Sequence, residues 1–137
     1  MNAKRKSGFT LVEIMVVVVI IGILATFAIA KFSGQADAAR VRTTKALLVQ
    51  IAGQLDIFKL AHGRYPDSLE ELIHAPSWLT DPKSFPPEGY LKELPVDGWG
   101  NKLIYRRGTS SAKPFELLSY GADGRQGGDS LDEDLLY

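Results

Sequence analysis

The sequence predicts an α+β protein in which one long N-terminal helix packs on a small antiparallel β-sheet. Three features predict this fold: an apolar run from Phe9 to Ala30, an amphipathic stretch from Gln35 to Ala61, and two short β-rich segments near the C-terminus. With 137 residues, the chain has room for about one small domain besides the apolar run. The net charge is zero and there is no cysteine, so no nucleic-acid partner is expected and disulfides and thiolate metal sites are excluded.

The apolar run is long enough to cross a membrane as a helix. Its 22 residues span about 33 Å at roughly 1.5 Å per residue, which covers the hydrocarbon core. The preceding cations Lys4, Arg5 and Lys6 would hold this end in the cytoplasm and leave the C-terminal part outside. One alternative is a secretory signal with an imperfect cleavage site between Ala25 and Ala30. Another is a buried core helix, which so small a chain could not cover on all sides.

Glu13 is the single acidic residue in this apolar run. A charged residue at the centre of a membrane helix costs roughly 2.5 to 3.5 kcal/mol on insertion scales, so its presence needs a reason. One interpretation is that Glu13 lies near the membrane surface and extends its carboxylate to water. The other is that it pairs with a cation inside a bundle of packed helices. It would then fix their stagger, because a misplaced carboxylate would remain unpaired.

A long amphipathic helix is predicted beyond the apolar run. Apolar residues recur there at intervals of three, four or seven: Val41, Leu48, Ile51, Leu55 and Phe58. This spacing places them on one buried face of a helix. Gly63 and Pro66 predict the end of that helix, because glycine terminates helices and proline cannot continue one.

A short helix and a long ordered loop are predicted next. Ser68 and Glu71 have the spacing of a capping box, in which each side chain hydrogen-bonds the other residue's backbone at a helix start. The stretch 75–102 is dense in proline and glycine, which predicts a loop. Apolar residues in both segments would pin them to the long helix: Leu69, Leu72, Ile73, Trp78, Phe85, Tyr90, Leu91, Leu94 and Trp99.

Two strands joined by a hairpin complete the predicted domain. The segments "KLIYRR" from Lys102 and "FELLSY" from Phe115 are rich in residues that favour strands. The sequence "GTSSAKP" between them is typical of a hairpin connection.

The C-terminal segment is acidic and rich in glycine. Its acids are Asp123, Asp129, Asp132, Glu133 and Asp134. Carboxylate and carbonyl oxygens on a flexible loop suit calcium, although the spacing does not match the EF-hand pattern. A solvated acidic terminus is an equally good interpretation of the residues alone.

The N-terminal sequence "KSGFTLVEIMVVVVIIGILA" resembles the class III signal of type IV pilins and type II secretion pseudopilins. The resemblance implies that a prepilin peptidase cleaves after Gly8 and methylates the new N-terminal Phe9. It also implies that Glu13 pairs with the N-terminal amine of a neighbouring subunit in a filament. Cleavage would remove three cations and leave the mature chain with an excess of acidic residues.

This resemblance divides the chain into three parts. It implies a leader peptide at 1–8, a transmembrane and assembly helix at 9–31, and a periplasmic domain at 32–137. Relatives commonly carry a proline at the position of Ala30, so this chain lacks the residue that would bend or loosen the helix there.

The segments "EGYLKELPVDGWGNKLIY" and "SYGADGRQGGDS" resemble the protein G family, the major pseudopilins of type II secretion. Together with the N-terminal signal, the resemblance covers nearly the whole chain and implies a type IV pilin-like fold. Two differences are Gly98, where the common family motif has a proline, and Ser130, where relatives often have an acid or glycine. The resemblance also implies a C-terminal calcium-binding loop. Its ligands would be four aspartate side chains and two nearby main-chain oxygens: Asp123, Asp129, Asp132, Asp134, Leu118 and Tyr120.

The family resemblance implies a structural subunit that polymerises from the inner membrane into a pseudopilus and drives export of folded proteins across the outer membrane. Implied partners are further copies of the chain, minor pseudopilins, the inner-membrane secretion platform, the prepilin peptidase and the membrane. The alternative is a type IV pilin or competence pseudopilin of another filament, such as one for DNA uptake, but the acidic C-terminal stretch would repel phosphate. An enzyme is not expected, because His62 and His74 lack recognisable metal-ligand partners and no nucleophile motif is present.

Overall fold

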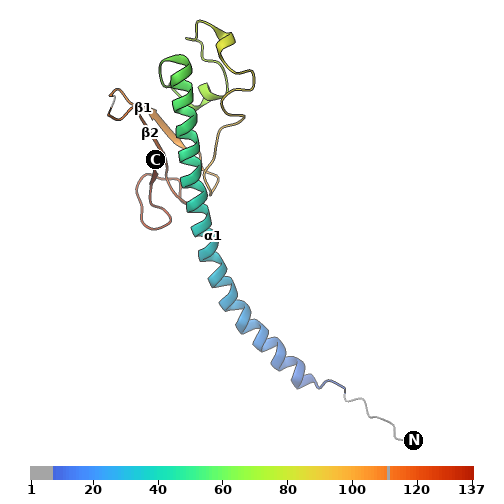
Figure 1. The fold of residues 1–137 in the computed structure, drawn as a ribbon. Coiled ribbons are helices and arrows are strands. Elements are labelled where there is room, and N and C mark those ends of the chain that lie inside the picture. Colours follow the sequence, from blue (N-terminus) through green and yellow to red (C-terminus); the bar gives the residue numbers. More distant parts are fainter. Residues whose placement is uncertain (1–7, 111) are drawn as a thin grey trace, which may run out of the picture. The chain divides into compact units, whose positions relative to one another are not determined.

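A computed structural model of the chain describes residues 8–110 and 112–137 (Figure 1). The elements follow in the order α1 (Leu11–His62), the 3₁₀ turns η1 (Leu69–Leu72) and η2 (Pro82–Ser84), and then β1 (Ile104–Arg107), β2 (Phe115–Ser119) and β3 (Leu135–Leu136). The predicted α+β class is therefore confirmed. The chain divides into two compact units, with the boundary between Ala36 and Asp37.

In the second unit, α1 contributes one face to the hydrophobic core. Its buried residues recur one, three or four positions apart: Thr44, Leu48, Ile51, Ala52, Leu55 and Phe58. This spacing confirms the predicted amphipathic helix. Phe58 is fully buried, and its ring makes edge contacts with the rings of Tyr90 and Trp78, whose centroids lie 5.3 and 6.0 Å away.

The end of α1 lies where the sequence predicts it. Gly63 follows the last helical residue and has a φ of 79°, a left-handed conformation that glycine adopts without strain. The Gly63 N–H donates to the Lys59 carbonyl at 2.7 Å, which satisfies one of the last helical acceptors. The chain then turns back, and the Pro66 carbonyl accepts a hydrogen bond from the Tyr105 hydroxyl at 2.7 Å. The helix end is thereby tied to β1.

The capping box predicted at Ser68 is wrong. Residues Leu69–Leu72 form a 3₁₀ turn, and Ser68 makes no side-chain cap hydrogen bond. Glu71 instead accepts from the Asp67 N–H at 2.9 Å and from the Trp78 indole N–H at 3.1 Å. So short a segment gains too few α-helical hydrogen bonds to offset nucleation, so these local bonds prevail. The two leucines of the turn are nevertheless buried, as predicted.

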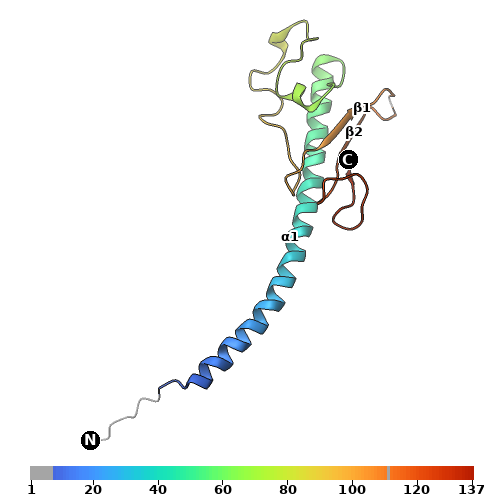
Figure 2. The same cartoon turned by 180° about the vertical axis from the view of Figure 1, so that it is seen from behind.

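The proline- and glycine-rich loop packs its apolar residues on the core, as predicted. Phe85 is buried, and the others are partly buried against the core: Trp78, Tyr90, Leu91, Leu94 and Trp99. His62 joins the same group, since its Nε2 lies 2.8 Å from the Tyr90 hydroxyl and its ring stacks on that of Phe85. Figures 1 and 2 show this loop on one side of α1 and the β1–β2 hairpin on the other.

The sheet is antiparallel with the strand order β1-β2-β3. Ile104 pairs with Leu118 and Arg107 with Phe115, which confirms the predicted hairpin. The sequence does not predict β3, because two residues are too few to show a strand periodicity. This strand pairs with the end of β2 and closes the acidic loop between them. Core residues from this region are Leu103, Phe115, Leu117, Leu118 and Leu135.

Candidate assembly segment and acidic loop

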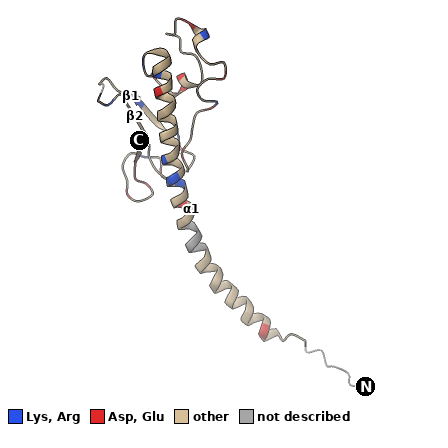
Figure 3. Ribbon diagram, viewed as in Figure 1, with Lys and Arg blue, Asp and Glu red and all other residues tan. Residues whose placement is uncertain are grey.

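Glu13 is held at the start of α1 by a reciprocal arrangement with Thr10. The Glu13 carboxylate accepts from the Thr10 N–H at 3.2 Å and from its hydroxyl at 3.4 Å, and the Glu13 N–H donates to that hydroxyl at 3.2 Å. This is a capping box, which the Thr-x-x-Glu spacing could have predicted and sequence analysis missed. Figure 3 shows acidic colour at this end of α1, followed by a long uncharged stretch. The carboxylate therefore also lies at the positive end of the helix dipole.

The segment Leu11–Ala28 is long and apolar enough to cross a membrane, and no other helix in the described part of the chain is. None of it is buried within the chain. Even Val17, its least exposed large apolar side chain, is 48% exposed. A soluble monomer rarely exposes so large an apolar surface, which is suited to contact with lipid or with other apolar helices.

Gly8 and Phe9 lie directly before α1 and are both exposed. Phe9 is 82% exposed, and among the described residues no atom beyond the chain neighbours lies within 4 Å of the position that a Cβ would take at Gly8. No other described residue covers the peptide bond between them. Residues 1–7 of the predicted leader lie outside the described residues. The backbone of α1 continues without interruption through position 30, while the side chain of Ala30 also lies outside the described residues.

The loop between β2 and β3 contains the four aspartates predicted as calcium ligands. Two of them use a carboxylate oxygen within the loop: Asp123 accepts from the Arg125 N–H at 2.9 Å, and Asp134 from the Gly127 N–H at 3.0 Å. These bonds close two turns of the backbone.

The predicted aspartate side chains are spread along the loop in the described part of the chain. Within residues 8–110 and 112–137, no three acidic or histidine side chains lie close enough together to hold one metal ion. The donor types suit calcium, which prefers oxygen ligands, but the side-chain positions do not form a coordination shell. The assignment therefore stays a prediction for Asp123, Asp129, Asp132, Asp134, Leu118 and Tyr120.

A buried polar network joins the acidic loop to the turn that follows Asp97, which is 5% exposed. Asp97 Oδ1 accepts from the N–H groups of Trp99 and Asn101 at 2.9 and 2.8 Å, and Oδ2 accepts from the Ser119 hydroxyl at 2.6 Å. The Gly121 N–H donates to Ser119 Oγ at 3.2 Å, and the Gly121 carbonyl accepts from Asn101 Nδ2 at 3.0 Å. Gly121, near the start of the acidic loop, is therefore held by hydrogen bonds from both Ser119 and Asn101.

Sequence analysis missed this network. An aspartate before a glycine-rich turn does signal a local bond to the turn backbone. Nothing in the spacing, however, indicates that Asp97 reaches Ser119 on β2.

These features define a pilin-like protein: an N-terminal apolar helix with an acidic residue at its start, continued by an amphipathic stretch that packs on a small antiparallel sheet.

Comparisons with known proteins identify the family. Residues 31–136 match the family described as type II secretion system protein G, and residues 3–29 match the prokaryotic N-terminal methylation motif. The chain is 45% identical to the type II secretion system core protein G of Pseudomonas aeruginosa, over 98% of this chain and 96% of that protein. It is 35% identical to the protein of the same name from Vibrio cholerae, over 96% and 91% of the two chains.

A solved structure supports the same assignment. The crystal structure of the major pseudopilin from the type 2 secretion system of enterohaemorrhagic Escherichia coli has a TM-score of 0.58 and 26% sequence identity with this chain. The match covers 76% of this chain and 90% of that one.

The chain belongs to the type II secretion system protein G family. It is a structural subunit of the type II secretion pseudopilus, anchored in a membrane by its N-terminal helix. The methylation motif implies processing by a prepilin peptidase. The resemblance seen in the sequence is thus confirmed, and the family match favours a secretion pseudopilus over a filament for DNA uptake.

Proposed function

We propose that this chain is the repeating subunit of a periplasmic filament that drives folded proteins across the outer membrane. In this proposal it assembles with further copies of itself and with minor pseudopilins on the inner-membrane secretion platform. The observation that supports this most is the apolar surface of Leu11–Ala28, none of which is buried within the described chain. Once a subunit leaves the bilayer, only the helices of neighbouring subunits can cover that surface.

Residues 1–8 are proposed to be a leader that the prepilin peptidase removes before it methylates Phe9. Residues 9–31 would then anchor the subunit in the inner membrane, with 32–137 in the periplasm. The exposure of Gly8 and Phe9 beside the helix start supports this processing. The mass of the mature chain tests it: a chain that begins with methylated Phe9 is expected, and an intact leader contradicts the proposal.

Glu13 is proposed to pair with the N-terminal amine of Phe9 in a neighbouring subunit. Among the described residues, its carboxylate bonds only to Thr10, a neutral donor that leaves the charge uncompensated. Burial of an unpaired carboxylate among packed helices costs several kcal/mol, which a cationic amine at hydrogen-bond distance can offset. Only one stagger of the helices would bring the two groups together.

Replacement of Glu13 by glutamine tests this pairing. Glu13→Gln keeps an oxygen acceptor for Thr10 but removes the charge, so we expect normal membrane insertion and leader cleavage with at least tenfold fewer filaments. Thr10→Ser, which keeps the capping hydroxyl, is the matched control and should assemble normally. Parental filament yield in Glu13→Gln would show that the charge does not set the stagger.

The acidic loop is proposed to bind calcium. Residues 121–134 contain five carboxylates and one cation, Arg125, and none of these acids forms an ion pair within the described residues. Such a group of carboxylates is self-repelling, and a dication that takes oxygen ligands would relieve the repulsion. Four glycines with φ between 66° and 101° let the loop backbone turn its carbonyls inward. Binding requires the aspartate side chains to draw together from the positions described above.

Thermal unfolding of the full chain in detergent, in calcium and in chelator, tests the metal proposal. At 100 times the dissociation constant, a ligand of the folded state adds about 2.7 kcal/mol to its stability. This gain should disappear in Asp123→Ala and persist in Glu88→Ala, which alters an exposed acid outside the loop. Identical melting curves for the parent in calcium and in chelator contradict the metal site and leave the filament role untouched.

The proposed role is structural rather than catalytic. The His62 ring packs among Phe58, Phe85 and Tyr90, so this histidine belongs to the wall of the core. The other histidine, His74, is exposed beside the 3₁₀ turn.

A further inference from the structure

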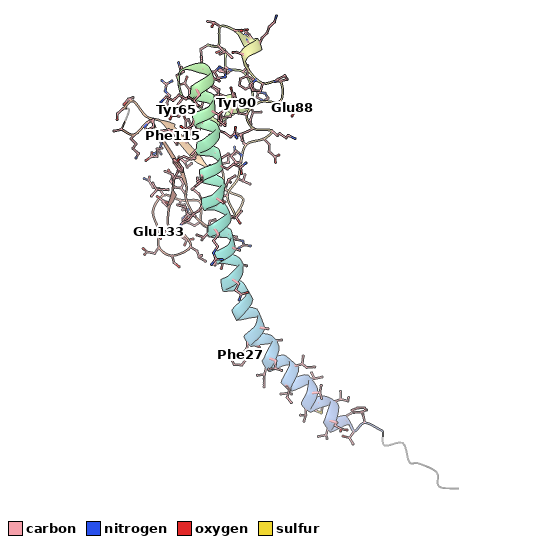
Figure 4. The ribbon with its side chains drawn as sticks, viewed as in Figure 1. Phe27, Tyr65, Glu88, Tyr90, Phe115 and Glu133 are labelled. Carbon is pink, nitrogen blue, oxygen red and sulfur yellow. The ribbon has the colours of Figure 1, made fainter. Side chains whose placement is uncertain are left out.

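An open pocket of about 550 Å³ lies between the end of α1 and the β1–β2 hairpin turn. We name it the basic pocket and define it by the following side chains: Lys59, Arg64, Tyr65, Arg107 and Ser110. In Figure 4, Tyr65 marks its place beside the C-terminal end of α1. Three of the five side chains carry a positive charge, so the pocket suits an anionic group.

At the basic pocket, one carboxylate forms ion pairs with two arginines. The Asp67 oxygens lie 2.5 Å from Arg64 Nη2 and 2.6 Å from Arg107 Nη1. Lys59 forms no ion pair among the described residues, and its Nζ lies 4.8 Å from the centroid of the Tyr65 ring. A single acid facing three cations leaves the pocket positive.

The charged side chains beside the pocket do not reverse its positive balance. Glu116 is shared by Arg106 and Lys113, at 3.0 and 3.1 Å. The other nearby acid, Asp56, accepts a hydrogen bond from the Tyr65 hydroxyl at 2.8 Å. Burial, and then this bond, raise the pKa of Tyr65 to about 12, so its phenol adds no negative charge at neutral pH. The pocket and these neighbouring side chains together hold five cations and three carboxylates.

Arg64 has an unused donor. Its Nε is buried and has no hydrogen-bond partner within the described residues. The guanidinium lies over the Trp78 ring, with its Cζ atom 4.4 Å from the ring centroid. A guanidinium and a carboxylate match in a planar, two-bond geometry, and a turn of the Arg64 side chain would offer its Nε to such a group.

The opposite charge gathers elsewhere in the same unit. We name residues 123–134 the acidic segment; it contains five acids and one cation, Arg125. Glu133 marks it in Figure 4, farther from the C-terminal end of α1 than Tyr65. A bound calcium ion would lower the negative charge of the acidic segment without cancelling it. Asp129 and Glu133 are exposed, so a second subunit could reach them.

We propose that the basic pocket of one subunit binds the acidic segment of a second copy of this chain in the filament. Two complementary surfaces at separate places on one subunit make a head-to-tail contact, and contacts of that kind extend into open helical filaments. The contact lies outside the apolar helix segment. Its charges would therefore help to set the register between neighbouring subunits, in addition to the packing of their helices. It builds on the filament role and does not require calcium.

Disulfide trapping in assembled filaments tests the contact, and the absence of native cysteine makes the background clean. Ser110→Cys places a thiol in the basic pocket and Gln126→Cys places one in the acidic segment, both at exposed positions. The full-length double variant should give a ladder of dimers, trimers and longer chains on non-reducing gels. Each single variant lacks the second thiol and should not form a ladder. Ser110→Cys combined with Glu88→Cys is the matched control pair and should resemble the single variants.

Charge reversal supplies a second measurement that does not depend on thiol geometry. Lys59→Glu and Glu133→Lys should each lower filament yield severalfold, and the two combined should restore most of it. Glu133 is exposed and lies outside the proposed calcium ligands. Lys92→Glu, an exposed reversal outside the pocket, is the control and should leave the yield unchanged.

Two outcomes would overturn the contact. The first is a double-cysteine variant that assembles like the parent and yields no ladder. The second is a loss in Lys59→Glu that Glu133→Lys does not restore, which would assign the pocket to another anionic partner such as a lipid headgroup. Absence of filaments from the parent chain would instead count against the filament role itself.

Discussion

Two stretches of α1 have the same backbone structure and opposite surroundings. From Leu11 to Ala28 no residue is buried, and Leu24 is 62% exposed. From residue 44 to 58, one face of the helix is at most 1% exposed. The first stretch is apolar on all sides, whereas the second is apolar chiefly on one face, which the chain's own loop and sheet cover.

The two stretches affect two different free energies: that of folding one subunit, and that of covering its exposed apolar surface. The core-facing stretch contributes to the folding free energy of a subunit, because its side chains leave water when the domain folds. The exposed stretch does not contribute to the folding free energy of the subunit. Its side chains leave water only when a bilayer or neighbouring subunits cover them. Substitutions in the two stretches should therefore change different measurements.

The largest expected effect follows truncation of a core side chain on α1. Phe58→Ala should lower the free energy of unfolding by about 3–5 kcal/mol, because it leaves a cavity among the aromatic rings. Chemical denaturation of the full chain in detergent, followed by near-ultraviolet circular dichroism, measures it. Phe27→Ala is the matched control, since Phe27 is 73% exposed in the apolar stretch. Equal losses in the two variants would break the distinction between the stretches.

The next effect concerns the turn that covers the start of the buried face. Asp97→Ala removes the acceptor of three hydrogen bonds, from Trp99, Asn101 and Ser119. Buried donors left unpaired cost about 1–3 kcal/mol each, partly relieved by water, so a total loss of about 3 kcal/mol is expected. The same denaturation experiment measures it, with Glu88→Ala as the control. A loss below about 0.5 kcal/mol would show that the network contributes little beyond what water can replace.

The sequence predicts the parts of the fold that depend on neighbours along the chain. The helical period from Val41 to Phe58 gives the buried face of α1, and Gly63 gives its end. β3 has two residues and depends on pairing with β2 across the acidic loop, so local sequence cannot indicate it. The capping-box prediction at Leu69–Leu72 is wrong for a related reason. Glu71 accepts a hydrogen bond from Trp78, seven residues away, and a capping rule does not consider such a partner.

The functional residues follow the same rule: local contacts are predictable from the sequence and distant ones are not. The Thr10–Glu13 box is local and its signal lies in the sequence, although the strong apolar pattern around it dominates the interpretation. The Asp97–Ser119 bond joins residues 22 positions apart and emerges only from the folded chain. The acidic segment is recognisable by composition, but composition does not fix which oxygens would converge on a metal ion.

A smaller effect is expected where the turn contacts α1 most closely. Gly98 donates its N–H to the buried Thr44 hydroxyl at 2.9 Å, and a Cβ at Gly98 would lie 2.7 Å from the Arg40 carbonyl oxygen. Gly98→Pro removes this donor and adds atoms at the contact. We expect a loss of about 1–3 kcal/mol in denaturation experiments.

Gly98→Ala separates the two causes, because alanine keeps the N–H and adds only the Cβ. A smaller loss in Gly98→Ala than in Gly98→Pro would assign the difference to the missing hydrogen bond and the proline ring. If Gly98→Pro were as stable as the parent, the close approach to Arg40 would not constrain this position.

The smallest expected effect is a gain on the exposed face of the same helical stretch. Gly53 lies in the middle of α1, is exposed, and has no atom within 4 Å of its Cβ position. Gly53→Ala should therefore stabilise the domain by about 0.5–1 kcal/mol, because alanine loses less backbone entropy in a helix. Ala46→Gly, at another exposed position of α1, is the reciprocal control and should destabilise by a similar amount. A lower melting temperature for Gly53→Ala in the detergent-solubilised chain would show that this face contacts something within the subunit. An unchanged subunit stability with reduced filament yield would instead place the face at a contact between subunits.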